Sequence, residues 1–205
     1  MNKVKVLYLF IVCILILTNC QDAKNSEVKI SEPHTMQPIE KEILLNKSDS
    51  NSYRIFSFDV GQNFVAISPL PGKVNLSQDI ATIKNQGINN VITLVSHEEL
   101  ISKDLDHFMI EMEKAGIEIF HSPIVDYGLP SQEQMDSISS YVNKCLANNQ
   151  NVLIHCMGGF GRSGTVMGCY AKKYLNQPNP IQYVRDTRGE EAIETEEQEK
   201  FVLTY

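Results

Sequence analysis

The strongest constraint on the fold lies between residues 152 and 174, where an apolar run passes through a glycine-rich turn into a helical pattern. Residues 152–154 read Val-Leu-Ile, a continuous apolar run typical of a buried strand. Three glycines fall within residues 157–161, and residues 163–174 predict a helix. A strand that turns directly into a helix is a unit of α/β domains.

The rest of the chain repeats this alternation. Further strands are predicted at residues 64–67, 91–95 and 117–120. Apolar residues at helical spacing predict helices at residues 76–86, 105–115, 135–146, 180–187 and 195–203. Gly87 and Gly116 end the first two of these helices. We therefore expect an α/β fold, with a central, mostly parallel sheet flanked by helices on both faces.

The 205 residues divide by composition into three parts. Residues 52–205 carry the alternating elements and form one domain of ordinary size. Residues 20–51 are polar, contain two prolines and show no sustained period, so they predict a flexible tether. Residues 1–19 carry lysines at positions 3 and 5, followed by an uncharged apolar run.

The apolar run covers residues 6–17. As a helix it would be about 18 Å long, short of the roughly 30 Å hydrocarbon core of a bilayer. A secretory signal fits better. Its end, Leu17-Thr18-Asn19-Cys20, resembles the lipobox of bacterial lipoproteins, which implies cleavage after residue 19 and a lipid on Cys20. We expect an exported protein, membrane-anchored through Cys20 or periplasmic or secreted. An uncleaved anchor, or a signal cut elsewhere, is the alternative.

Charge and cysteine content exclude several classes of protein. The formal net charge is −7, which disfavours nucleic acid as a partner. Five scattered cysteines do not form a disulfide framework, and no CxxC pair or histidine spacing predicts a metal site. No cofactor is expected.

The turn after residue 154 has the chemistry of an anion-binding loop, a name we use for residues 156–162. Glycines allow successive N–H groups to turn toward one point, and the helix amino end adds partial positive charge. Arg162 can fork two N–H groups onto two phosphate oxygens. The same field stabilises a thiolate at Cys156 and makes it a nucleophile.

The pattern Cys156-x5-Arg162-Ser163, preceded by His155, resembles the active-site loop of the protein tyrosine and dual-specificity phosphatase superfamily. It is most similar to kinase-associated phosphatases of the cyclin-dependent kinase inhibitor 3 type. Residues 122–130, here named the acid loop, resemble that family's general-acid loop, and residues 184–198 resemble its segment after the active-site loop. The resemblance covers about residues 55–205 and implies the cysteine-phosphatase fold.

The resemblance also implies catalytic roles. Cys156 attacks phosphorus and Arg162 holds the equatorial oxygens. Asp126 protonates the leaving oxygen and then deprotonates the attacking water. Ser163 donates a hydrogen bond to the departing sulfur, and Gln198 orients the water. The substrate-binding set consists of Met157, Gly158, Gly159, Phe160, Gly161 and Arg162. No metal is needed, because Arg162 and the amides meet the phosphate charge.

Several of these residues have simpler interpretations. Asp126 could be a solvated turn residue, Ser163 an N-cap and Gln198 a surface residue of a Glu-rich helix. His155 is expected to be a packed ring behind the loop. Arg185 and Arg188 are expected to pair with nearby acids or to steady the loop.

The predicted function is a cysteine-dependent phosphatase acting on phosphotyrosine or phosphoserine/threonine in proteins, or on a small phosphomonoester. The resemblance implies that relatives acting on multiply phosphorylated inositols carry lysines in this loop. The loop here contains none, which argues against such substrates. One alternative is a phosphoprotein-binding module without turnover, since an exported thiolate is exposed to oxidation. A rhodanese-like sulfurtransferase is a further alternative, although its loop needs neither Asp126 nor Ser163.

Overall fold

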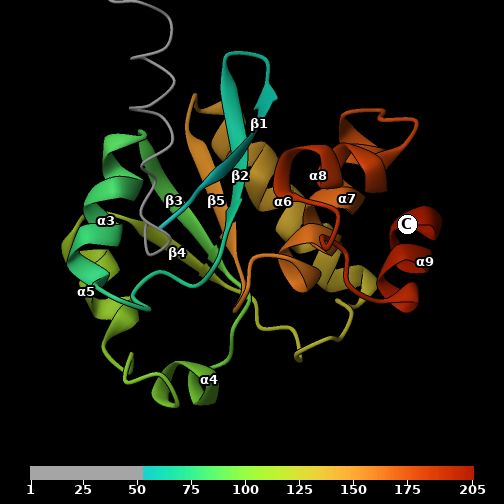
Figure 1. Cartoon of the computed structure of the whole chain (residues 1–205). Coiled ribbons are helices and arrows are strands. Elements are labelled where there is room, and N and C mark those ends of the chain that lie inside the picture. The colour runs from blue at the N-terminus through green and yellow to red at the C-terminus, as the bar shows by residue number, and fades with distance from the viewer. Residues whose placement is uncertain (1–52) are drawn as a thin grey trace, which may run out of the picture. The chain divides into compact units, whose positions relative to one another are not determined.

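The computed structural model of the chain describes residues 53–205 (Figure 1). The predicted signal at residues 1–19, the tether at residues 20–51 and the lipidation site Cys20 lie outside the described residues. Within residues 53–205, no helix combines the length and the apolar character that crossing a bilayer requires.

The described residues form an α/β fold around a five-stranded sheet with strand order β1-β2-β5-β3-β4 (Figure 1). The strands are β1 (Phe56–Val60), β2 (Asn63–Ser68), β3 (Ile88–Thr93), β4 (Glu118–His121) and β5 (Asn151–His155). β1 pairs with β2 antiparallel, and all other pairs are parallel. The predicted fold class, a mostly parallel sheet in an α/β domain, is confirmed.

Helices cover both faces of the sheet, as expected. The helices are α3 (Leu76–Asn85), α4 (His97–Ile101), α5 (Phe108–Lys114), α6 (Gln132–Ala147), α7 (Gly161–Tyr174), α8 (Pro180–Arg188) and α9 (Glu196–Thr204). Successive residues of β5 belong to two hydrophobic cores, one on each face of the sheet. Val152 and Ile154 pack with α6 to α9, whereas Leu153 packs with α3 and α5. A central strand that is buried on both faces explains why residues 152–154 are continuously apolar.

Some elements differ from those predicted. The structure adds β1, which forms a hairpin with β2 through Gly61 (φ +64°). It also adds α4, a single short helix. α5 begins at Phe108 rather than at residue 105, and Asp104, before the expected start, has a left-handed backbone conformation (φ +57°). α7 begins at Gly161, two residues earlier than expected.

The parallel strands bring four connections to one edge of the sheet. His155 at the end of β5 is paired with Ser68 of β2 and with Thr93 of β3, and Thr93 is paired with His121 of β4. The segments that follow these residues therefore meet at the carboxyl edge. In open α/β sheets this edge is where ligands bind.

Candidate active site

The anion-binding loop follows β5, and its carbonyl groups accept hydrogen bonds from donors that surround the loop. Four successive carbonyl oxygens accept hydrogen bonds: Met157 O from Leu70 N (3.2 Å), Gly158 O from Arg188 Nη2 (3.0 Å), Gly159 O from Arg188 Nε (2.8 Å), and Phe160 O from Gly164 N (3.0 Å) and Ile193 N (3.2 Å). In a trans peptide the carbonyl and the next N–H point in opposite directions. The outward carbonyl groups therefore leave the N–H groups of residues 158–161 directed to the inner side of the loop.

Cys156 lies at the base of this loop and is 3% exposed. Its Sγ accepts a hydrogen bond from Gly159 N at 3.2 Å and lies 3.4 Å from Ser163 Oγ. Ser163 is fully buried in the first turn of α7. It is not the N-cap, which is Phe160, so the simpler interpretation of Ser163 is wrong. The sulfur is thus surrounded by a backbone donor, a hydroxyl and the amino end of α7.

The glycines of the loop serve different purposes. Only Gly159 needs the left-handed backbone region (φ +74°), and a Cβ there would lie 2.5 Å from the backbone of Ser68 and Pro69. At Gly161 a Cβ would approach Glu194 Oε2 to 2.1 Å. Conformational freedom is therefore required at Gly159, whereas Gly161 is required for close packing.

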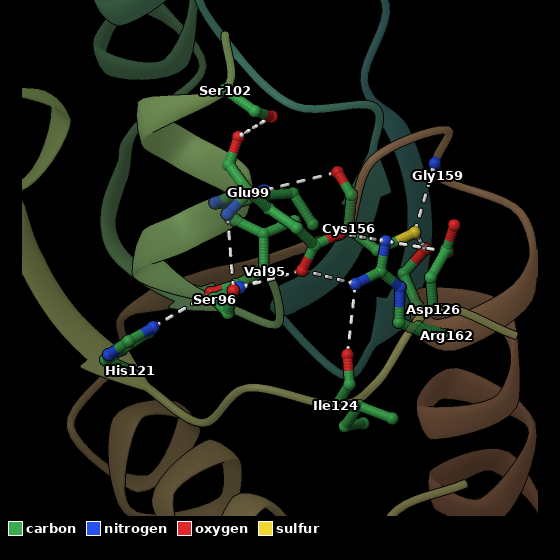
Figure 2. A network of polar contacts seen from close by, with 12 residues as sticks. Val95, Ser96, Glu99, Ser102, His121, Ile124, Asp126, Cys156, Gly159 and Arg162 are labelled. Atoms are coloured by element: carbon green, nitrogen blue, oxygen red, sulfur yellow. Dashed lines mark hydrogen bonds and ion pairs between the residues drawn. The ribbon is translucent and has the colours of Figure 1, made fainter. Parts of the chain in front are cut away.

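Arg162 extends from α7 into the site with a side chain that is 1% exposed. Nη1 donates to Glu99 Oε2 and to Ile124 O, each at 3.0 Å (Figure 2). Nη2 lies 2.9 Å from Glu99 Oε1 and 2.9 Å from Asp126 Oδ1. These two contacts are ion pairs without hydrogen-bond geometry, so among the described residues Nη2 has no acceptor for its N–H groups.

Neighbouring groups keep the Arg162 guanidinium protonated. Burial lowers the pKa of the guanidinium, but the hydrogen bond to Glu99 and the negative charges of Cys156, Glu99 and Asp126 raise it above its ordinary value. Arg162 is therefore a fixed cation with donors available beside the sulfur.

Glu99, which the sequence analysis missed, is the main partner of Arg162. It lies on α4, where Ser96 and Glu99 form a capping box. Burial raises the pKa of the Glu99 carboxyl, but hydrogen bonds from Arg162 and Ser96 N and the charge of Arg162 hold it below its ordinary value. The signal was present in the sequence as Ser96-x-x-Glu99 directly after the strand predicted at residues 91–95.

Asp126 is brought to the same guanidinium by the acid loop. Its side chain is 59% exposed, in contrast to the buried Arg162 that it contacts. The loop is anchored by Ile124, whose N–H donates to Leu94 O and whose carbonyl accepts from Arg162. A tight turn, with Gly128 N donating to Val125 O at 2.8 Å, presents Asp126 toward the site (Figure 2).

Gln198 is fully buried, so its interpretation as a surface residue is wrong. Its Oε1 accepts from Glu194 N at 2.9 Å, and its Nε2 donates to Gly128 O at 3.3 Å. Gln198 therefore links α9 to the acid loop. Its amide keeps one further N–H and one further lone pair.

His155 is a buried ring behind the loop, as expected. Nε2 lies 3.0 Å from Thr93 Oγ1, and Nδ1 lies 3.4 Å from Cys156 O. A carbonyl can only accept, so Nδ1 carries the proton and Nε2 accepts from Thr93. Burial lowers the pKa of His155 to about 4, because a charged imidazolium has no solvent there.

The other two cysteines of residues 53–205 and the two arginines of α8 pack or bond within the fold. Cys145 and Cys169 are buried free thiols, and burial raises the pKa of Cys169 to about 12. Arg185 binds Ala192 O, Ile193 O and Glu199, and Arg188 binds the loop. Both arginines are therefore placed as expected. Among residues 53–205, no cluster of three or more His, Cys, Asp or Glu side chains could hold a metal ion.

Comparison with known proteins places this site in a family. Residues 68–174 match the family described as "Polymorphic toxin system, DSP-PTPase phosphatase". The chain is 31% identical to rat (Rattus norvegicus) cyclin-dependent kinase inhibitor 3 over 148 residues, which cover 68% of this chain and 70% of the relative. It is also 46% identical over 90 residues to an uncharacterised protein of Methanocaldococcus jannaschii. That match covers 43% of this chain and only 60% of the relative.

Solved structures agree with the sequence matches. A kinase-associated phosphatase with its catalytic-site cysteine replaced by serine superposes with a TM-score of 0.69 at 27% identity, covering 75% of this chain and 94% of that one. Tk-PTP in its active form superposes with a TM-score of 0.61 at 29% identity, covering 76% of this chain and 97% of that one. The chain belongs to the dual-specificity phosphatase superfamily.

Proposed function

We propose that this chain is a cysteine-dependent phosphatase that hydrolyses phosphotyrosine or phosphoserine/threonine monoesters of proteins through a cysteinyl-phosphate intermediate. The observation that carries the proposal is the convergence on one point of the Cys156 sulfur, the inward N–H groups of the anion-binding loop and the Arg162 guanidinium. The family membership and the phosphatases among the relatives support the same activity.

In the first step the Cys156 thiolate attacks phosphorus. The S–P bond forms while the P–O bond to the leaving group breaks, and Asp126 gives its proton to the leaving oxygen. Charge spreads over the three equatorial oxygens in the transition state. The loop amides and the free N–H groups of Arg162 Nη2 are placed to stabilise that charge.

In the second step water attacks the cysteinyl phosphate. The Asp126 carboxylate takes the water proton, a P–O bond forms, and the S–P bond breaks with its electron pair returning to sulfur. The Ser163 hydroxyl, 3.4 Å from Sγ, donates a hydrogen bond to the returning thiolate. Gln198 has one N–H and one lone pair beyond its bonds to Gly128 and Glu194, and these orient the water.

The surroundings of the loop support a singly phosphorylated protein as substrate. Besides its glycines, the loop between Cys156 and Arg162 contains only Met157 and Phe160, so it adds no second cation for a second phosphate. Beside Asp126, the side chains of Val125 and Tyr127 are 81% and 64% exposed. This apolar rim suits the ring of a phosphotyrosine or the aliphatic parts of a peptide.

Hydrolysis of an aryl phosphate by the reduced full chain tests the proposal. Cys156→Ser should abolish phosphate release, whereas the matched control Cys145→Ser, which removes another buried thiol, should retain it. Equal rates for wild type and Cys156→Ser would eliminate the proposed mechanism. Phosphopeptide binding without phosphate release by wild type would favour the binding module, and thiosulfate turnover would favour a sulfurtransferase.

We also propose that the chain is exported and anchored to a membrane by a lipid on Cys20. The basic start, the short apolar run and the Leu-Thr-Asn-Cys sequence support this proposal. The mass of the mature amino terminus tests it. A lipid-modified Cys20 at position one is the expected result, and an intact residue 1 or an unmodified Cys20 would contradict it.

A further inference from the structure

We propose that Arg188, at the end of α8, is a positioning residue that sets the orientation of the phosphate-binding amides from the outer side of the anion-binding loop. Arg162 approaches the bound phosphate from within the site, whereas Arg188 acts on the backbone of the loop. The inference rests on the proposed function, since it assigns the loop amides to the phosphate of the substrate.

The hydrogen bonds of Arg188 fall on two consecutive peptide groups. Nη2 donates to Gly158 O at 3.0 Å and Nε donates to Gly159 O at 2.8 Å. Each planar peptide that has its carbonyl fixed also has the following N–H fixed, pointing the opposite way. The two bonds therefore direct the N–H groups of Gly159 and Phe160 inward. Gly159 N does point inward, because it donates to Cys156 Sγ at 3.2 Å.

Gly159 is the position in the loop where such control is most needed. Its backbone has a φ of +74°, in the left-handed region that glycine adopts readily. Glycine is also the residue that loses most conformational freedom when its backbone is fixed. Its amide is also the one that contacts the sulfur. A loop that turned either peptide around would present a carbonyl oxygen, and hence negative charge, to the phosphate.

Two aromatic rings fix the plane of the Arg188 guanidinium. Its central carbon lies 3.4 Å from the centroid of the Phe160 ring and 4.3 Å from that of Phe56. Phe160 belongs to the loop itself and Phe56 to β1, the edge strand that the sequence analysis missed. Stacking on Phe160 and bonding to two carbonyls both require a planar, forked group, which lysine lacks.

The charge of Arg188 adds to the geometry. Burial lowers the pKa of the guanidinium, while the charges of Cys156, Glu191 and Glu194 oppose that shift. A cation at the carbonyl ends of two peptides polarises them, and their N–H ends become stronger donors. The anion-binding loop thus has one guanidinium on its inner side and a second one behind its backbone.

The test is the affinity of the reduced full chain for tungstate, a phosphate-like oxyanion, measured by calorimetry. Arg188→Lys keeps the charge and loses the fork, and should weaken binding about 10-fold or more; one lost oxyanion donor costs enzymes about 10²–10³-fold in rate. Arg185→Lys is the matched control, three residues earlier on α8 and bonded to Ala192, Ile193 and Glu199 instead. It should bind tungstate within about 2-fold of wild type.

Amide hydrogen exchange, followed by NMR, separates positioning from general destabilisation. In Arg188→Lys, exchange at Gly159 and Phe160 should accelerate while the amides of β5 keep their protection. In Arg185→Lys the loop amides should not change.

Unaltered tungstate affinity together with unaltered exchange at Gly159 and Phe160 in Arg188→Lys would overturn the inference. Failure of wild type to bind tungstate would overturn it as well. Wild type that binds tungstate, but releases no phosphate from an aryl phosphate, would reject the proposed function and leave the inference about Arg188 standing.

Discussion

The two loops that build the site are held in opposite ways. In the anion-binding loop, Cys156 and Arg162 are buried, and four consecutive carbonyls are bonded from outside. In the acid loop, Asp126 is 59% exposed between two exposed apolar side chains. Hydrogen bonds hold the acid loop on both sides of Asp126, at Ser122, Pro123 and Ile124 before it and at Gly128 after it, but no hydrogen bond to the Asp126 carboxylate is present among the described residues.

This difference matches what each loop must do. Electrostatic stabilisation of a transition state is strongest when the donors are fixed in advance, because no reorganisation is then needed during the reaction. A general acid must reach a leaving group that differs from substrate to substrate, and then release it. On the proposed function, we expect the buried anion-binding loop to stabilise the transition state and the exposed Asp126 to meet the leaving group of the substrate.

The largest effect is expected at Arg162, where the fixed loop meets the acid loop. Arg162→Lys cannot bridge Glu99, Ile124 O and phosphate together, so kcat should fall by about 10³-fold or more. Steady-state hydrolysis of an aryl phosphate measures this effect, with Arg185→Lys as control. A loss below 10-fold would mean that the guanidinium does not act on the transition state.

Asp126→Asn should separate the two loops. Loss of the proton donor should lower kcat by about 10²–10³-fold. Tungstate affinity should not fall, because the fixed loop is unchanged. Asp59→Asn, at an exposed position on β1, is the control. A parallel loss of kcat and oxyanion binding would show that the loops do not have separate tasks.

Gly159→Ala should show how tightly the anion-binding loop is packed. The added methyl group meets the backbone of Ser68 and Pro69 at 2.5 Å, and φ is +74°. Overpacking and left-handed strain together should cost about 4 kcal/mol of unfolding free energy. Gly61→Ala has φ +64° but no atom within 4 Å, and should cost about 1–2 kcal/mol. Similar denaturant midpoints for the two variants would refute this difference in packing.

His155 should make the region behind the anion-binding loop sensitive to acid. Its pKa is lowered from 6.5 to about 4 in the folded state, so below pH 6.5 the unfolded chain binds the proton first. The contribution of neutral His155 to the free energy of unfolding is fully present above pH 6.5. It is lost as the pH falls to about 4, which lowers the free energy of unfolding by on the order of 3 kcal/mol.

Denaturant unfolding at several pH values measures this loss. His155→Gln should flatten the pH dependence relative to wild type, whereas His107→Gln, at a half-exposed position, should not. Parallel curves for wild type and His155→Gln would contradict the assignment.

Much of the fold could be predicted because its central strands are continuously apolar and its helices are amphipathic. Continuous apolar runs at residues 152–154 and 91–95 predict strands that are buried on both faces. β1 was missed although Phe56–Val60 alternates between apolar and polar residues, the pattern of a strand with one face exposed. α4 was missed because a five-residue helix has no period to detect.

The site was predictable where the chemistry is local in sequence. Cys156, Arg162 and Ser163 lie in one loop and the first turn of α7, so their spacing in the sequence predicts that they lie close together. Glu99 and Gln198 reach the site through tertiary contacts, 63 residues from Arg162 and 70 from Gly128 respectively. The capping box Ser96-x-x-Glu99 marks the start of a helix but not the contact of Glu99 with Arg162. Gln198 was named only through the family resemblance, and the Glu-rich sequence around it suggested exposure where the structure has burial.

The most direct test of the account is to identify the atom that carries the phosphoryl group during turnover. With a nitrophenyl phosphate, whose weakly basic leaving group departs without a proton donor, Asp126→Asn should slow hydrolysis of the intermediate more than its formation. Rapid acid quenching of this variant, followed by peptide mass spectrometry, should then trap the intermediate. The account predicts one phosphoryl group on the peptide containing Cys156, bound through sulfur. Turnover with no such adduct, or with the phosphoryl group on another residue, would contradict it.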